Sequence, residues 1–279
     1  MYNIAGAPEV TAVEASVSSF YDGVGSIFVE AYDAFYSADP PAMIAGDIAF
    51  YERLARDAGG AVLELACGTG RVAVPLAEAG LDVTGVDNAE AMLAIAARRV
   101  QAAPASVRER LTLVQGDMTD LDLGRTFGLV FVAFRSFQLL LTVERQRQAL
   151  QVIRRHMQPG GRMALHLFDP RLELMIGDGG AGRIAAGTHP VTGRRYVAEV
   201  LRADIDHVAQ VRWDLWRYTE VGDNDAVLAE ATRQMALRWT YRWELRHLLE
   251  ACGFTIKDEF SDFFGAGPAY GRELIVVAA

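Results

Sequence analysis

Between residues 42 and 168, short and nearly continuous apolar runs alternate with segments in which apolar residues recur every three to four positions. The continuous runs are typical of buried strands, and the periodic segments are typical of amphipathic helices. The runs predict strands at 61–65, 82–86, 111–115, 129–134 and 162–168. The periodic segments predict helices at 42–56, 72–79, 89–101 and 143–157. This alternation predicts an α/β fold with a mostly parallel sheet that helices cover on both faces.

The pattern changes after residue 170, where apolar and polar positions alternate one by one between turn signals. Val211, Trp213 and Leu215 show this alternation, which predicts a small antiparallel sheet inserted at residues 171–240. A helix at 241–252 and strands at 254–260 and 273–277 are expected after it. Residues 1–41 are rich in Tyr and Phe. We therefore expect a single domain over residues 1–279, to which residues 1–41 and 171–240 are additions.

The first strand carries Glu64 and leads into a turn that contains Gly68 and Gly70. A helix follows, and the second strand then ends in Asp87. Glycines permit turn conformations that other residues resist, and they let the backbone approach a ligand closely. An acidic residue at the tip of the second strand can accept both hydroxyls of a ribose. The segment therefore predicts a site for a nucleoside cofactor.

Two cofactors fit the glycines, and Glu64 favours one of them. Gly68-x-Gly70-x-x-Ala73 also matches the fingerprint of dinucleotide-binding proteins, so an NAD-dependent oxidoreductase is one interpretation. A carboxylate just before the turn would, however, repel a pyrophosphate bound at the helix N-terminus. It suits S-adenosylmethionine, which has a sulfonium and an ammonium group and no phosphate. The oxidoreductase interpretation also leaves the Gly116-Asp117 loop unexplained.

In these features the chain resembles the class I S-adenosylmethionine-dependent methyltransferases, over roughly residues 45–169 and 240–279. Glu64 to Gly70 match their first motif, Asp87 matches their ribose-binding acid, and Asp117 in Gln115-Gly116-Asp117-Met118 matches their adenine-contacting aspartate. The resemblance implies a Rossmann-like sheet of seven strands with a C-terminal antiparallel hairpin. It implies S-adenosyl-L-methionine as cofactor and S-adenosyl-L-homocysteine as product. It also implies that residues 1–41 form a lid and that residues 171–240 cover the acceptor pocket.

The candidate residues for binding the cofactor come from the lid, the glycine turn and the strand tips. The candidate cofactor residues are Tyr21, Tyr32, Glu64, Ala66, Gly68, Gly70, Arg71, Asp87, Asn88, Met92, Gly116, Asp117, Met118 and Phe134. Some have a second interpretation. Arg71 either reaches the methionine carboxylate or is a solvated residue of the first helical turn. Met92 either forms a wall for the purine or packs in the core. Asn88 is also a candidate N-cap for the helix that follows it.

Three further residues are candidates for the chemistry, because open α/β sheets bind ligands beyond the carboxyl ends of their strands. Arg135 follows the fourth strand and either binds an anion or pairs with a nearby carboxylate. His166 in the fifth strand is a candidate base or a hydrogen-bonded core histidine, and Asp169 is a candidate base or amine-binding carboxylate. Methyl transfer from a sulfonium is an in-line displacement, so holding the reactants in line can suffice.

Charge and composition narrow the class of partner. The net charge of −9 disfavours nucleic acid, whose phosphates reward clusters of Lys and Arg. The segment after the fourth strand also lacks the Asn/Asp-Pro-Pro-aromatic motif of methyltransferases that modify nucleic-acid bases. The two cysteines and five histidines show no metal-binding spacing. With no membrane-length apolar run and no signal-like N-terminus, we expect a cytoplasmic protein that does not bind membranes.

The sequence thus predicts transfer of a methyl group to a nitrogen or oxygen of a small-molecule acceptor. Similarity of the lid segment at residues 32–36 to that of the sugar N-methyltransferases favours nitrogen. A protein that binds S-adenosylmethionine without catalysis is the remaining alternative to an enzyme. The terminal hairpin, the lid and exposed apolar residues each offer a surface for a homodimer.

Overall fold

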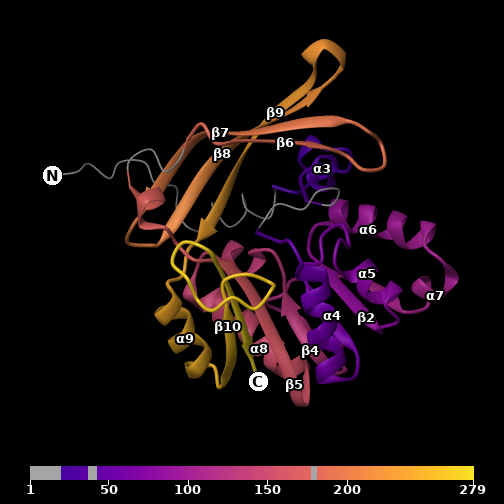
Figure 1. Cartoon of the computed structure of the whole chain (residues 1–279), viewed down its shortest axis with the longest axis vertical. Coiled ribbons are helices and arrows are strands. Elements are labelled where there is room, and N and C mark those ends of the chain that lie inside the picture. The colour runs from indigo at the N-terminus through magenta and orange to yellow at the C-terminus, as the bar shows by residue number, and fades with distance from the viewer. Residues whose placement is uncertain (1–19, 37–42, 177–180) are drawn as a thin grey trace.

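A seven-stranded sheet forms the centre of the computed structural model, which describes residues 20–36, 43–176 and 181–279 (Figure 1). The strands lie in the order β10-β11-β5-β4-β1-β2-β3, and β11 alone runs opposite in direction to the other six. Their bounds are β1 Val62–Leu65, β2 Val83–Asp87, β3 Leu111–Gln115, β4 Phe127–Val132, β5 Met157–Phe168, β10 Ile256–Phe260 and β11 Glu273–Ala278. The predicted Rossmann-like α/β class, with its C-terminal antiparallel hairpin, is confirmed.

Helices cover both faces of this sheet, as the continuous apolar strands require. On one face α4 and α5 pack together, and Tyr51 of α4 stacks on Phe131 of β4 with the ring centroids 4.2 Å apart. On the other face α8 and α9 pack through residues such as Ile153 and Leu249. The helices of this layer structure are α4 Asp47–Ala58, α5 Ala73–Glu78, α6 Glu90–Ala102, α7 Ala105–Arg108, α8 Val143–His156 and α9 Arg242–Ala251. None of the helices in the described residues has the length and apolar character needed to cross a membrane.

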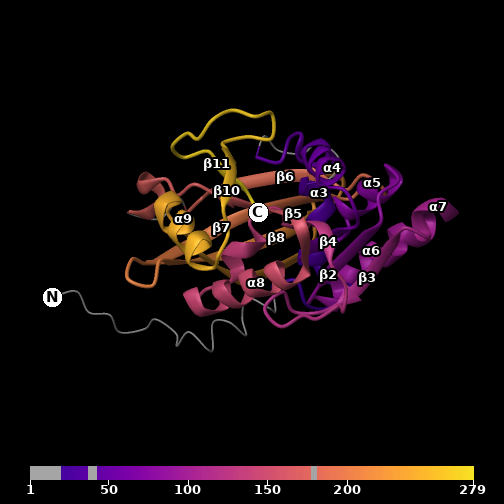
Figure 2. The same ribbon diagram turned by 90° about the horizontal axis from the view of Figure 1, so that it is seen from below.

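A second sheet lies above the first in Figure 1 and is antiparallel throughout, as predicted. Its strands are β6 Ile184–Thr188, β7 Arg195–Asp206, β8 Val211–Val221 and β9 Val227–Arg238. Seen from below in Figure 2, the helices and strands of the seven-stranded sheet lie in front of it. The predicted insertion at 171–240 includes this sheet, although residues 177–180 lie outside the described residues.

Two short N-terminal helices join the sheets. They are α2 (Ile27–Glu30) and α3 (Tyr32–Tyr36). Phe28 and Phe35 surround Tyr218 of β8, with ring centroids 4.6 and 5.6 Å from it. These phenylalanines of the N-terminal segment are thus buried against the second sheet. Residues 1–19 and 37–41 of the predicted lid lie outside the described residues.

Several local predictions were wrong. The helix expected from residue 42 begins at Asp47, and the strand expected from residue 162 begins at Met157. Two further errors fall beside strand tips. Asn88 does not cap α6, because the helix begins at Glu90 and the Ala89 amide is taken by the carboxylate of Asp87 instead. The fourth strand ends at Val132, two residues earlier than predicted. The chain then turns through Phe134 and Arg135, which have φ angles of 46° and 67°. Consecutive left-handed residues other than glycine are strained, and such strain gathers at functional sites.

Candidate active site

The glycine turn lies at the carboxyl end of β1, between the tips of β2 and β4. Ala66, Gly68 and Gly70 have φ angles of 58°, 56° and 74°, a conformation that glycine adopts without strain. A side chain at Gly68 would also come within 3.3 Å of the Met92 methyl group. The turn therefore brings bare backbone next to Met92, which is itself buried.

Asp87 ties this turn to the loop after β2. One carboxylate oxygen, Oδ2, accepts the Gly68 amide at 2.7 Å, and Oδ1 accepts the Ala89 amide at 2.9 Å. Burial raises the pKa of the carboxyl, while these backbone hydrogen bonds act to lower it. A carboxylate oxygen has lone pairs for more than one donor, so Asp87 can hold the turn and still accept hydrogen bonds from a ligand.

Arg71 is neither solvated nor free, since it forms a buried ion pair with Asp47 of α4. Its Nη1 donates to Oδ1 at 3.1 Å, and its Nη2 contacts Oδ2. The solvated alternative for Arg71 is therefore wrong, and Asp47 is a residue of the candidate site that the sequence did not reveal. The pair places the positive charge of Arg71 and the negative charge of Asp47 near Glu64.

Glu64 is 98% enclosed, and its Oε2 has no hydrogen-bond partner among the described residues. Burial raises the pKa of its carboxyl well above the usual range, against the opposing charge of Arg71. A buried carboxyl oxygen without a donor is costly, and a ligand with a cationic or N–H group would satisfy it.

Glu64→Gln is expected to stabilise the protein without ligand at pH 8 and to remove part of its pH dependence. A raised pKa means that protonated Glu64 stabilises the fold below about pH 4.3, the pKa of an unfolded glutamate. That stability is lost as the pH rises through the folded-state pKa, and glutamine has no such loss. Thermal melting from pH 4 to 9 checks this. An unchanged melting profile would contradict it.

The lid tyrosines lie against the turn. Tyr21 and Tyr32 pack edge to face, with centroids 5.8 Å apart, in one apolar cluster with Met92. Asp33 fastens the segment, because its Oδ1 accepts the Thr69 hydroxyl at 2.9 Å. Burial raises the pKa of Tyr32, which keeps its hydroxyl protonated. The sequence had singled out these tyrosines but not Asp33.

The loop after β3 joins the same edge of the sheet. The Gly116 amide donates to the Asp87 carbonyl at 3.0 Å, and the Asn88 carbonyl accepts from Gln115 at 3.4 Å. Asp117 Oδ1 accepts the Thr119 amide at 2.8 Å, while its Oδ2 pairs with an arginine of α8. Partial burial acts to raise the pKa of Asp117, but the hydrogen bonds from Thr119 and the charge of the arginine act more strongly, and the pKa is lowered. Met118 is partly buried against the core.

Arg135, His166 and Glu273 form an ionic group at the tips of β4, β5 and β11, here termed the strand-tip cluster. Arg135 Nη2 donates to Glu273 Oε1 at 2.7 Å and to Oε2 at 2.9 Å. His166 Nε2 lies 2.8 Å from Oε2, and its ring is fully enclosed. Burial lowers the pKa of His166, so the ring is neutral and Nε2–H donates. The structure thus gives Arg135 its carboxylate pair and His166 its core hydrogen bond.

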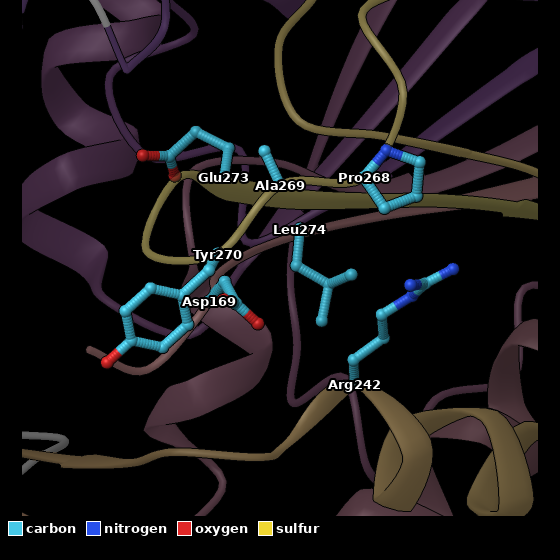
Figure 3. Close-up of a pocket in the computed structure, with 7 residues that line it drawn as sticks. All are labelled: Asp169, Arg242, Pro268, Ala269, Tyr270, Glu273 and Leu274. Carbon is cyan, nitrogen blue, oxygen red and sulfur yellow. The ribbon is translucent and has the colours of Figure 1, made fainter. Parts of the chain in front are cut away.

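A pocket of about 210 Å³ opens beside this cluster (Figure 3). Its walls come from the end of β5, the loop before β11 and the start of α9. The lining residues are Asp169, Arg242, Pro268, Ala269, Tyr270, Glu273 and Leu274. In Figure 3 the carboxylate of Glu273 points away from Leu274 and Arg242, whereas that of Asp169 points toward the side where Arg242 lies. Asp169 Oδ2 accepts the Gly271 amide at 2.8 Å, whereas Arg242 pairs with Glu259.

Sequence reasoning missed Glu273, which is the centre of the strand-tip cluster. It lies at the first position of the final strand, where the printed pattern Arg272-Glu273-Leu274 gives a charged residue before an apolar run. That charged residue at the start of an apolar strand could have marked Glu273 as a candidate. The residues of this sequence do not show which strands lie beside the final one, so the pairing of Glu273 with Arg135 and His166 could not be predicted.

Known proteins resemble this chain in sequence and in fold. A family model described as a methyltransferase domain matches residues 62–161. The cypemycin N-terminal methyltransferase of a Streptomyces species is 32% identical over 176 residues, which cover 63% of this chain and 67% of the relative. Other curated relatives are matched over about half of their own length.

Two solved structures have the same fold. The CcbJ methyltransferase from Streptomyces caelestis has a TM-score of 0.75 at 24% identity, over 94% of this chain and 98% of its own. S-adenosylmethionine-bound CalS10 from Micromonospora echinaspora, an amino pentose methyltransferase involved in calicheamicin biosynthesis, has a TM-score of 0.62 at 26% identity. That match covers 86% of this chain and 92% of CalS10.

Proposed function

The chain belongs to the class I S-adenosylmethionine-dependent methyltransferases, and we propose that it methylates an amine nitrogen of a small-molecule acceptor. This family membership sets aside the dinucleotide oxidoreductase interpretation. One observation carries the choice of nitrogen. Asp169 lines the pocket and has no ion-pair partner among the described residues, so its carboxyl group can attract an amine. One relative is named for methylation at an N-terminus, and a solved structure of the same fold is named an amino pentose methyltransferase.

We propose that the cofactor lies along the tips of β1, β2 and β3. Asp87 would accept the ribose hydroxyls, and Glu64, with its unpartnered oxygen, would accept the ammonium group. Asp117 would receive the adenine amino group, with Asn88 and Gly116 beside it. The remaining proposed contacts are the turn residues Ala66, Gly68 and Gly70, the apolar walls Met92 and Met118, and Arg71, Tyr21, Tyr32 and Phe134.

The proposed mechanism is mainly one of positioning. S-adenosylmethionine, when bound, supplies an electrophilic methyl group. Asp169 would bind the amine as a cation and orient it. The ammonium would release one proton to solvent, because only the neutral nitrogen has a lone pair that can take the methyl group. The lid and the second sheet would exclude water during the transfer. Phe134, next to Arg135, stands where the cofactor site and the pocket meet, and its ring lies 4.6 Å from that of Tyr36. Orientation of this kind is worth about 7–11 kcal/mol of barrier.

Matched acceptors test the choice of nitrogen. We expect benzylamine and ethanolamine to drive formation of S-adenosylhomocysteine at least tenfold faster than benzyl alcohol and ethylene glycol, because only the amines present a group that Asp169 attracts as a cation. Coupled detection of S-adenosylhomocysteine measures this. Faster turnover of the alcohols would show that the acceptor atom is oxygen.

Asp169→Ala and His166→Ala test the positioning mechanism. We expect kcat to fall by less than about a hundredfold in each, which is the lower end of what a general base contributes. Affinity for S-adenosylhomocysteine, measured by titration, should stay as in the parent protein. A loss of several orders of magnitude in kcat, with that affinity intact, would mean that the residue is a dedicated base.

A further inference from the structure

Glu273 stands between the proposed cofactor site and the pocket. It lines the pocket, and its partner Arg135 directly follows Phe134 at the tip of β4. Its side chain is 13% exposed, so a small part of it remains accessible. Glu273 is therefore next to both proposed sites.

The hydrogen bonds of Glu273 are divided unevenly between its two oxygens. Oε2 receives His166 Nε2 at 2.8 Å together with Arg135 Nη2 at 2.9 Å and Nε at 3.2 Å. Oε1 receives only Arg135 Nη2, at 2.7 Å. A carboxylate has about four lone-pair positions. Oε2 is therefore filled, and Oε1 keeps room for one more donor.

The same contacts keep Glu273 charged. Burial acts to raise the pKa of its carboxyl, but the hydrogen bond from His166 and the charge of Arg135 outweigh it, and the pKa is lowered. Such a carboxylate is a poor proton acceptor and a lasting anion. The basic residue that lines the pocket, Arg242, pairs with Glu259 at 2.9 and 3.2 Å, and Glu259 also pairs with Arg246. Asp169 and Glu273 give the same lining two carboxyl groups against this one guanidinium, which favours a donor with positive charge.

We infer that Glu273 is a positioning and specificity-determining residue that receives an N–H of a cationic acceptor on Oε1, while Arg135 and His166 fix its carboxylate in place. The inference rests on the proposed function for the nature of the acceptor. It assigns His166 and Arg135 to Glu273 rather than to the substrate. It also explains the strained turn at Phe134 and Arg135, which sets the guanidinium against both carboxylate oxygens.

The test compares Glu273→Gln, which keeps the shape but not the charge, with Glu273→Asp, which keeps the charge. Glu52→Gln is the matched control, because Glu52 also accepts two hydrogen bonds from one arginine, on the surface of α4. Binding of benzylammonium and of benzyl alcohol to the protein loaded with S-adenosylhomocysteine is measured by calorimetry. Where benzylamine is methylated, KM and kcat are measured as well.

We expect the parent protein and Glu52→Gln to bind benzylammonium at least tenfold more tightly than benzyl alcohol. Glu273→Gln should lose that preference and raise KM at least tenfold, with S-adenosylhomocysteine affinity unchanged, and Glu273→Asp should recover part of it. Retention of the preference in Glu273→Gln, or no preference in the parent protein, would overturn the inference. Methylation of alcohols alone would defeat the proposed function, yet the binding preference would still decide the role of Glu273.

Discussion

Replacing Asp87 with alanine is expected to reduce the affinity for S-adenosylmethionine and S-adenosylhomocysteine at least a hundredfold. Two ribose hydroxyls would lose a charged acceptor, at about 1.5–3 kcal/mol each. Every 1.4 kcal/mol is a factor of ten in the dissociation constant. The turn would also lose the contact at 2.7 Å that holds the Gly68 amide. Isothermal titration of the purified protein measures the loss.

Asp122→Ala is the control for that titration. Asp122 also accepts a backbone amide, from Gly124 at 2.9 Å, but it is exposed and lies outside the candidate site. This variant should bind both ligands as the parent protein does. If Asp87→Ala binds them within a factor of three of the parent, the ribose does not lie on Asp87 and the proposed orientation of the cofactor is wrong.

Asp47→Ala is expected to cause a large loss of stability. It leaves the Arg71 guanidinium, 93% enclosed, without its carboxylate. Removing one partner of a buried ion pair costs about 3–5 kcal/mol, because the other charge stays buried. For a chain of this size, about 2–4 °C is lost per kcal/mol. We expect the melting temperature to fall by about 10 °C in a thermal denaturation experiment.

Two variants show whether the buried charge is the cause. Asp82→Ala breaks a pair with Arg125 that is about half exposed, and it should cost no more than about 1 kcal/mol. Asp47→Leu combined with Arg71→Met removes both charges and should recover much of the loss, because apolar residues of similar volume replace such pairs well. If the double variant melts as low as Asp47→Ala, the pair does not act through its charge.

Local patterns determined how much of the fold could be predicted. The strand at 111–115 was predicted with its true bounds, since its run of apolar residues is flanked by polar ones. The one-by-one alternation around Trp213 correctly indicated the antiparallel sheet. The predicted start of a helix was wrong where a side chain bound a backbone amide. Asp87 accepts the Ala89 amide, so Asn88 is not the N-cap that was predicted.

In the candidate site too, residues close in the sequence could be predicted to meet, and residues far apart could not. Glu64, Gly68 and Asp87 lie within one strand-turn-helix-strand unit, so their spacing indicates that they meet. Glu273 is 107 residues from His166 and 138 from Arg135, and Asp47 reaches Arg71 from a separate helix. Contacts of that kind depend on the order of strands in the sheet and on packing between helices, which hydrophobic periodicity does not encode.

A crystal structure of the protein with S-adenosylhomocysteine decides where the cofactor lies. We expect both ribose hydroxyls at about 2.5–3.2 Å from the Asp87 carboxylate. We also expect the amino group at Glu64 Oε2 and the sulfur facing the pocket beside Glu273. A ligand whose ribose lies away from Asp87, or whose sulfur faces away from this pocket, would contradict the proposed placement of the cofactor.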